Sequence, residues 1–170
     1  MKQSFPAGSL RFRPLDTENG RGSFLRCYED TWRIAHGTLA GFDAENIWRW
    51  TLWRASASGD AVREAYTDAG FAGYLALDER RGRDEGVLWV SFCYVDKSLR
   101  GKGFGRALLR EAERRARELG RRRVQLCTAE KNPALGFYEA QGYQRIGTEA
   151  GALEPLVLLE KETGTEYGEN

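Results

Sequence analysis

The stretch Val87–Val95 is apolar at nearly every position, and it constrains the fold of this chain more than any other segment. A strand with one buried face alternates apolar and polar residues, whereas a strand covered on both faces does not. Val87–Val95 is therefore predicted to be a central strand. Apolar residues follow at helical spacing from Phe104 to Leu119, and Gly120 is a natural C-terminal stop. This pattern predicts a helix that crosses over from the central strand.

The other segments alternate between strand and helix patterns. Residues 17–54 have helical character, with a break at His36-Gly37 and a second helix starting at Asp43 or Ala44. A further short helix is predicted after Pro133, through Ala140. The resulting order is β-α-α-β-β-β-α-β-α-β-β, an α/β fold. The remaining strands are predicted at 10–14, 62–67, 71–77, 123–128, 142–146 and 155–159.

Length and composition favour one soluble domain. The 170 residues are 41% hydrophobic, enough for a core, and no apolar run approaches the roughly 18 residues of a membrane span. We expect a single domain over 1–170, with its core at about 9–160 and a frayed tail at 161–170. The segment Met1–Ser9 has no apolar signal region, so we expect a cytoplasmic protein without membrane association.

The net charge of +1 hides one basic block. Residues 97–123 hold eleven Lys and Arg against three Glu, a local charge of +8, which leaves −7 for the remainder. A nucleic-acid-binding helix is one hypothesis for this block. The interleaved Glu111, Glu113 and Glu118 disfavour it, because pairs such as Glu111–Arg115 and Glu113–Arg117 indicate a solvated helix face. No nucleic-acid partner is expected. The basic residues concerned are Arg110, Arg114, Arg115, Arg117 and Arg121–Arg123.

The three cysteines do not indicate a metal site. Cys27, Cys93 and Cys127 are far apart in the sequence, and His36 is the one histidine. A zinc site needs clustered ligands. We expect three buried or half-buried thiols and no metal.

The junction between the central strand and its helix is rich in glycine: Arg100-Gly-Lys-Gly-Phe-Gly-Arg106. Glycines at alternate positions allow a tight turn that exposes backbone N–H groups, and the helix that follows adds the positive end of its dipole. This combination suits a phosphate or pyrophosphate. The spacing fits neither a P-loop nor a dinucleotide fingerprint, because Gly103 follows Lys102 and Arg106 stands where the latter needs a third glycine.

Two segments resemble the motifs of the GNAT acetyltransferase superfamily. The segment Tyr94–Leu109 looks like its motif A, R/Q-x-x-G-x-G/A, with matches at Arg100, Gly103 and Gly105. The segment Asn132–Tyr143 resembles N-x-x-A-x-x-F-Y-x-x-x-G-F/Y, with Asn132 one position closer to Ala134 than in that pattern. The resemblance implies a mixed, mostly antiparallel sheet of six to seven strands flanked by helices.

The resemblance also implies acetyl-coenzyme A as cofactor. Its pyrophosphate would lie on the amides of Gly101–Arg106, and its pantetheine arm would pair with the end of the central strand, where the strands splay apart. Tyr138 would stand near the sulfur and act as general acid. The implied cofactor-binding residues are Cys93, Tyr94, Val95, Arg100, Gly101, Lys102, Gly103, Phe104, Gly105, Arg106, Asn132 and Tyr138.

The expected reaction is transfer of an acetyl group to the primary amine of a small molecule, peptide or protein. A catalytically inactive acyl-coenzyme A-binding domain is the alternative. Tyrosine can donate a proton to the departing thiolate, and a backbone N–H at 93–95 can stabilise the oxyanion. The base is left open among Glu29, Asp30, Ser91 and His36, with Glu29 named first. Members of this superfamily are often dimers, so a homodimer is one candidate for the oligomeric state, which the sequence leaves open.

Five N-terminal aromatic residues lie in the region where members of the superfamily form their acceptor site. Core packing is the expected role of most of them, and one or two are expected to line an acceptor pocket. They are Trp32, Phe42, Trp48, Trp50 and Trp53.

Overall fold

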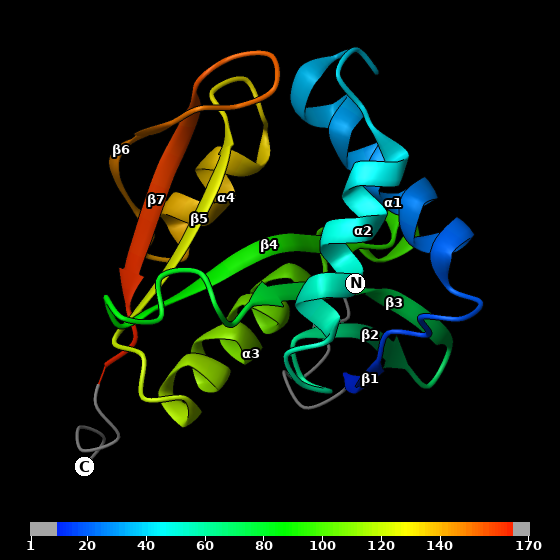
Figure 1. Cartoon of the computed structure of the whole chain (residues 1–170), viewed down its shortest axis with the longest axis horizontal. Coiled ribbons are helices and arrows are strands. Elements are labelled where there is room, and N and C mark those ends of the chain that lie inside the picture. The colour runs from blue at the N-terminus through cyan, green and yellow to red at the C-terminus, as the bar shows by residue number, and fades with distance from the viewer. Residues whose placement is uncertain (1–9, 165–170) are drawn as a thin grey trace.

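The structure, a computed structural model, describes residues 10–164. Seven strands form one sheet and four helices cover it (Figure 1). The helices are α1 (Arg21–His36), α2 (Ala44–Ala55), α3 (Phe104–Glu118) and α4 (Ala134–Ala140). The strands are β1 (Arg11–Pro14), β2 (Val62–Thr67), β3 (Gly70–Asp78), β4 (Val87–Val95), β5 (Arg123–Ala129), β6 (Gln144–Glu149) and β7 (Leu156–Glu162).

The sheet is mixed and mostly antiparallel, which confirms the predicted fold class. Its strand order is β1-β2-β3-β4-β5-β7-β6, so β7 lies between β5 and β6. Only β4 and β5 pair in parallel, and α3 connects them. In Figure 1, α1 and α2 lie to one side of β4, while β5, β7 and α4 lie to the other.

A β-bulge in β4 distributes its side chains between two cores. Leu77 pairs with Val90 and Ala76 pairs with Phe92, so Ser91 is the extra residue of β4. Before the bulge, Val90 packs in the cluster that contains Leu108 and Leu109 of α3. After it, Phe92 packs with α1 and α2 instead. The bulge therefore inverts the side-chain alternation in the middle of the central strand.

Most predicted elements are found within two residues of their predicted bounds, but the predicted start of the tail at residue 161 is wrong. β7 continues through Glu162, whose register partner is Arg123 on β5. Thr163 is buried and donates its hydroxyl to the Arg121 carbonyl at 3.0 Å. The sheet thus extends past the predicted end of the core at residue 160. Residue 9 and residues 165–170 of the predicted core and tail lie outside the described residues.

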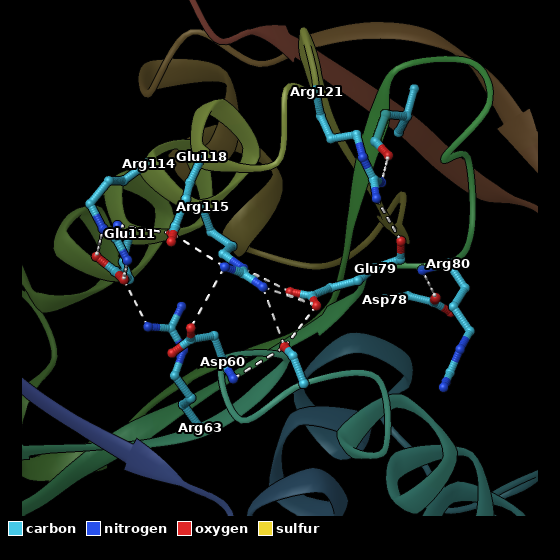
Figure 2. A network of polar contacts seen from close by, with 12 residues as sticks. Asp60, Arg63, Asp78, Glu79, Arg80, Glu111, Arg114, Arg115, Glu118 and Arg121 are labelled. Carbon is cyan, nitrogen blue, oxygen red and sulfur yellow. Dashed lines mark hydrogen bonds and ion pairs between the residues drawn. The ribbon is translucent and has the colours of Figure 1, made fainter.

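The basic block is not simply a solvated face. Arg115 of α3 is buried and makes two hydrogen bonds to Glu79, at 2.8 and 3.2 Å (Figure 2). Arg121 is also buried and donates to the backbone carbonyls of Val87 and Glu79, each at 2.9 Å. These arginines fix α3 to the segment after β3.

Both predicted pairs within α3 are wrong, because partners from other elements take their place. Glu111 accepts from Arg63 of β2 at 2.7 Å as well as from Arg114. Glu113 pairs with Lys161 of β7 at 2.5 Å. Burial of one face of α3 brings these distant partners within reach, and local i,i+4 spacing does not decide between them.

Residues 10–164 contain no helix that is long and apolar enough to cross a membrane. In the same residues, no three His, Cys, Asp or Glu side chains gather in a group that could hold a metal ion.

Candidate active site

The glycine-rich connection adopts the backbone that its sequence predicts. Gly101 and Gly103 have φ values of 75° and 92°, in the left-handed region that favours glycine. Gly103 is the N-cap of α3, where no side chain caps the helix and no acidic residue occupies the first turn. A Cβ on Gly105 would lie 3.1 Å from the Phe137 ring, so α3 and α4 approach closely here. The positive end of α3 is thus presented at the end of β4.

The three basic residues of this connection differ in their contacts. Lys102 and Arg106 form no ion pair or side-chain hydrogen bond within residues 10–164. Arg100, in contrast, donates to the Val95 carbonyl at 3.0 Å and pairs with Asp30 of α1 at 3.0 Å. Arg100 therefore joins the loop to α1, while Lys102 and Arg106 remain available to an anion.

β4 and β5 pair over only a short distance. Their register covers Val87–Trp89 against Arg123–Gln125, and β4 continues through Val90–Val95 with no partner on its β5 side among the described residues. The splayed strands that the resemblance implied are therefore present. The separation begins next to Ser91, whose hydroxyl is buried and unpartnered.

A cavity of about 180 Å³ lies at this separation. Its wall combines the α1 face, the unpaired part of β4, the end of β5, the connection that follows β5, one residue of α4 and the first residue of β7. Among the described residues, no Asp, Glu, Lys or Arg side chain lines it. The lining residues are Tyr28, Thr31, Trp32, Ala35, His36, Val90, Ser91, Phe92, Cys93, Leu126, Cys127, Thr128, Ala129, Asn132, Tyr138 and Leu156.

Tyr138 lines this cavity from α4. Burial raises the pKa of its hydroxyl well above the ordinary value, and the thiols of Cys93 and Cys127 add to the rise. Burial also raises the pKa of Cys93 to about 12 and is the main cause that raises the pKa of Cys127 to about 12. All three groups are therefore neutral at physiological pH, and the Tyr138 hydroxyl keeps its proton.

Asn132 is held by the protein itself. Its side-chain amide donates to the Thr128 hydroxyl at 2.7 Å and its carbonyl accepts from the Ala134 amide at 2.9 Å. These bonds connect the end of β5 to the start of α4. The contacts show Asn132 as a brace between these two elements, at the edge of the cavity.

Two of the residues considered as a base do not line the cavity. Glu29 pairs with Arg33 along α1 at 3.0 Å. Asp30 pairs with Lys97 and Arg100. Burial acts to raise the pKa of Asp30, but hydrogen bonds from Arg100 and Lys97 outweigh it and hold the pKa below its ordinary value. A carboxylate held in this way is a weak proton acceptor.

The structure brings His36 to the cavity. The sequence predicted a break at His36-Gly37, but His36 is the last residue of α1. The helix ends after it because the Gly37 C-cap has a φ of 69°. Tyr28 and Thr31 also reach the cavity, although they were not singled out as site residues. The helical spacing of Phe24, Tyr28 and Trp32 was the signal that could have placed them. Of the five aromatic residues considered, Trp32 lines the cavity, and Phe42 packs against Trp32 and Tyr28 without lining it. Trp48 is buried, and Trp50 and Trp53 are exposed.

Comparisons with known proteins agree with this geometry. The PaiA N-acetyltransferase of Thermoplasma acidophilum, solved with coenzyme A, is 19% identical, with a TM-score of 0.66 over 91% of this chain and 99% of its own. The YncA protein of Salmonella typhimurium, solved with acetyl-CoA, is 17% identical, with a TM-score of 0.64 over 95% and 98%. The ribosomal-protein-alanine N-acetyltransferase of Brucella melitensis is 24% identical, with a TM-score of 0.64 over 89% and 99%.

At these identities the likeness shows a shared fold. No curated protein sequence matches the chain. The family model described as the acetyltransferase (GNAT) family matches residues 13–143, which include the glycine-rich connection, the separated strands and α4. The chain therefore belongs to the GNAT acetyltransferase family.

Proposed function

We propose that this protein is an acetyl-coenzyme A-dependent N-acetyltransferase that transfers the acetyl group directly to a primary amine in a ternary complex. The observation that carries the proposal is the separation of β4 and β5. This separation opens a cavity that Tyr138 lines. The cavity lies beside β4, the strand that leads into the glycine-rich connection proposed to bind the pyrophosphate. The acceptor is the amine of a small molecule, peptide or protein.

The described residues fit the cofactor along its length. Lys102, Arg106 and the start of α3 provide positive charge for the pyrophosphate. The unpaired edge of β4, which includes Cys93, Tyr94 and Val95, provides backbone groups for the amides of the pantetheine arm. The orphaned Ser91 hydroxyl is a buried polar group that gains a partner if a polar ligand fills the cavity. The cofactor supplies a thioester, whose carbonyl carbon accepts the amine.

The protein has two tasks at this carbon. The first is positioning, because holding the amine against the thioester replaces a bimolecular encounter by a bound pair. The second is to supply a proton to the sulfur as the C–S bond breaks. The Tyr138 hydroxyl is protonated and lies near the Cys93 and Cys127 thiols at the cavity wall. It is the proposed donor.

The direct test combines binding and turnover. Titration calorimetry is expected to show saturable, one-to-one binding of acetyl-coenzyme A. With a panel of amines, release of free thiol is expected to exceed the rate without acceptor for at least one class. Absence of binding by a folded sample would refute the proposal. Binding without thiol release from any amine, peptide amines included, would favour the inactive domain.

Charge neutralisation at the connection gives a second, quantitative test. We expect Lys102→Ala and Arg106→Ala each to weaken acetyl-coenzyme A binding by about tenfold, since a hydrogen bond to a charged group contributes about 1.5 kcal/mol. This loss of affinity should become smaller as the salt concentration is raised, because salt screens the charges. Arg122→Ala is the matched control, an exposed arginine beyond the C-terminal end of α3. Equal losses in all three variants would contradict a local phosphate site.

A further inference from the structure

The cavity that holds the proposed reaction has few side chains able to take a proton from the amine. Its titratable lining groups are two cysteines, two tyrosines and one histidine. Burial raises the pKa values of Cys93, Cys127, Tyr28 and Tyr138, so these groups hold their protons. Imidazole is the side chain that exchanges a proton most readily near neutral pH. His36 is thus the group that geometry selects.

The contacts of His36 engage one face of its ring and one of its two ring nitrogens. Its ring packs on Trp32, with centroids 4.7 Å apart, and its side chain is 10% exposed. The Nδ1 atom is buried, without a hydrogen bond, and lies 3.7 Å from Oε1 of Glu154. With Nδ1 turned to this carboxylate, Nε2 is the nitrogen available to a bound amine.

Glu154 reaches His36 from a different part of the fold and does not itself line the cavity. It belongs to the connection between β6 and β7, which lies at the same end of the molecule as the C-terminus of α1 (Figure 1). A second contact joins the same segments, because a Cβ on Gly41 would lie 3.3 Å from Leu153 and 3.5 Å from Trp32. The α1–α2 connection and the β6–β7 connection therefore approach each other beside His36, and within residues 10–164 the Glu154 carboxylate is the one charged group that pairs with His36.

We propose that His36 is the proton acceptor for the amine and that Glu154 is its positioning residue; this inference rests on the proposed acetyltransferase function. As the new C–N bond forms, the proton on nitrogen passes to Nε2 of His36. The C–S bond breaks and the sulfur takes the proton of the Tyr138 hydroxyl. Proton exchange with solvent returns both side chains to their starting forms, so one amine and one thioester give one amide and one thiol. The Glu154 carboxylate keeps its negative charge throughout: it orients the Nδ1–H group of His36 and balances the charge of the imidazolium.

The single histidine of the chain permits a test that does not depend on activity. In an untagged, ¹⁵N-labelled sample at about pH 9, where imidazole is neutral, the ¹⁵N shifts report which nitrogen carries the proton. We expect the Nδ1-protonated tautomer. Glu154→Ala should remove this preference, and Glu154→Gln, which keeps an acceptor oxygen, should restore it. A wild-type chain with the proton on Nε2 would overturn the proposal.

Kinetics supply the second arm. We expect His36→Ala to lower kcat by about a hundredfold or more, with little change in the KM for the amine or in acetyl-coenzyme A binding. Added imidazole should restore part of that rate. Glu154→Ala should lower kcat by about tenfold, and Glu154→Gln by less. Glu45→Gln, on the exposed start of α2, is the control.

The outcomes separate the two proposals. Full activity of His36→Ala, or a loss confined to KM without rescue by imidazole, would overturn the role of His36 and leave the acetyltransferase proposal standing. A wild-type chain that binds no acetyl-coenzyme A, or that acetylates no amine, would overturn both.

Discussion

Replacing Arg115 by methionine is expected to lower the free energy of unfolding by about 3–5 kcal/mol, because it leaves the buried Glu79 carboxylate without its partner. The side chains of Arg115 and Glu79 are 10% and 9% exposed. Ser58 also donates to Glu79, at 2.7 Å, but it carries no charge to replace the guanidinium. Urea unfolding followed by tryptophan fluorescence measures the loss as a shift in midpoint.

Arg114→Met is the matched control, one position away on α3. Its side chain is 51% exposed and pairs with Glu111 and Glu118. Exposed pairs contribute less than about 1 kcal/mol. In a double-mutant cycle, Glu79→Gln together with Arg115→Met should be less harmful than the sum of the single changes, because neither charge is then buried alone. Equal effects of Arg114→Met and Arg115→Met would contradict the buried pair.

The Arg115–Glu79 pair also predicts how the difference in stability between wild type and Arg115→Met changes with pH. Burial acts to raise the pKa of Glu79, but hydrogen bonds from Arg115 and Ser58 outweigh it, so the pKa lies below its ordinary value. A carboxyl with a depressed folded pKa stabilises the protein above its unfolded pKa, about 4.3, and loses that contribution as pH falls through the folded pKa. The difference in the free energy of unfolding between wild type and Arg115→Met should therefore become smaller below about pH 4.

The sequence predicted those features whose causes are local. The left-handed turns at Gly101 and Gly103 need residues without a Cβ, and the glycines that allow them are visible in the sequence. The double burial of β4 is likewise visible in its apolar run. These two features, with the helix that follows, are enough to place an anion site at the end of a central strand.

Features that depend on distant partners could not be predicted. The bulge at Ser91 arises from the register of β4 against β3, and nothing in the local sequence marks it. Lys161 and Glu162 are charged and were predicted to begin a tail, yet both belong to β7 and pair with Val124 and Arg123 of β5. Arg115 lies four residues after Glu111 on α3, yet its buried partner is Glu79, which is distant in the sequence.

The base candidates show the same limit within the site. Helical spacing in α1 indicates which residues share a face but not which face meets the cavity. Glu154 lies in a connection without a motif, and its approach to His36 depends on how the β6–β7 connection meets the start of the α1–α2 connection. The pairing of these residues is a property of the assembled sheet.

Tyr138→Phe is expected to lower kcat by about a hundredfold to ten-thousandfold, the usual contribution of a positioned general acid. The ring stays in its contacts with Phe137 and Tyr143, at centroid distances of 5.5 and 6.4 Å, so the fold and the cavity should be retained. Stopped-flow or steady-state thiol release measures kcat, and calorimetry should give unchanged acetyl-coenzyme A affinity.

Tyr143→Phe is the matched control, because Tyr143 is a second buried tyrosine and does not line the cavity. It should retain kcat within about threefold. Because burial raises the pKa of Tyr138, its hydroxyl stays protonated well above pH 10, so wild-type kcat should not fall on the alkaline side through loss of this proton. If wild-type kcat fell with rising pH below pH 10, and this fall disappeared in Tyr138→Phe, the Tyr138 hydroxyl would be ionising in that range. That result would contradict the proton-donor role, as would full activity of Tyr138→Phe itself.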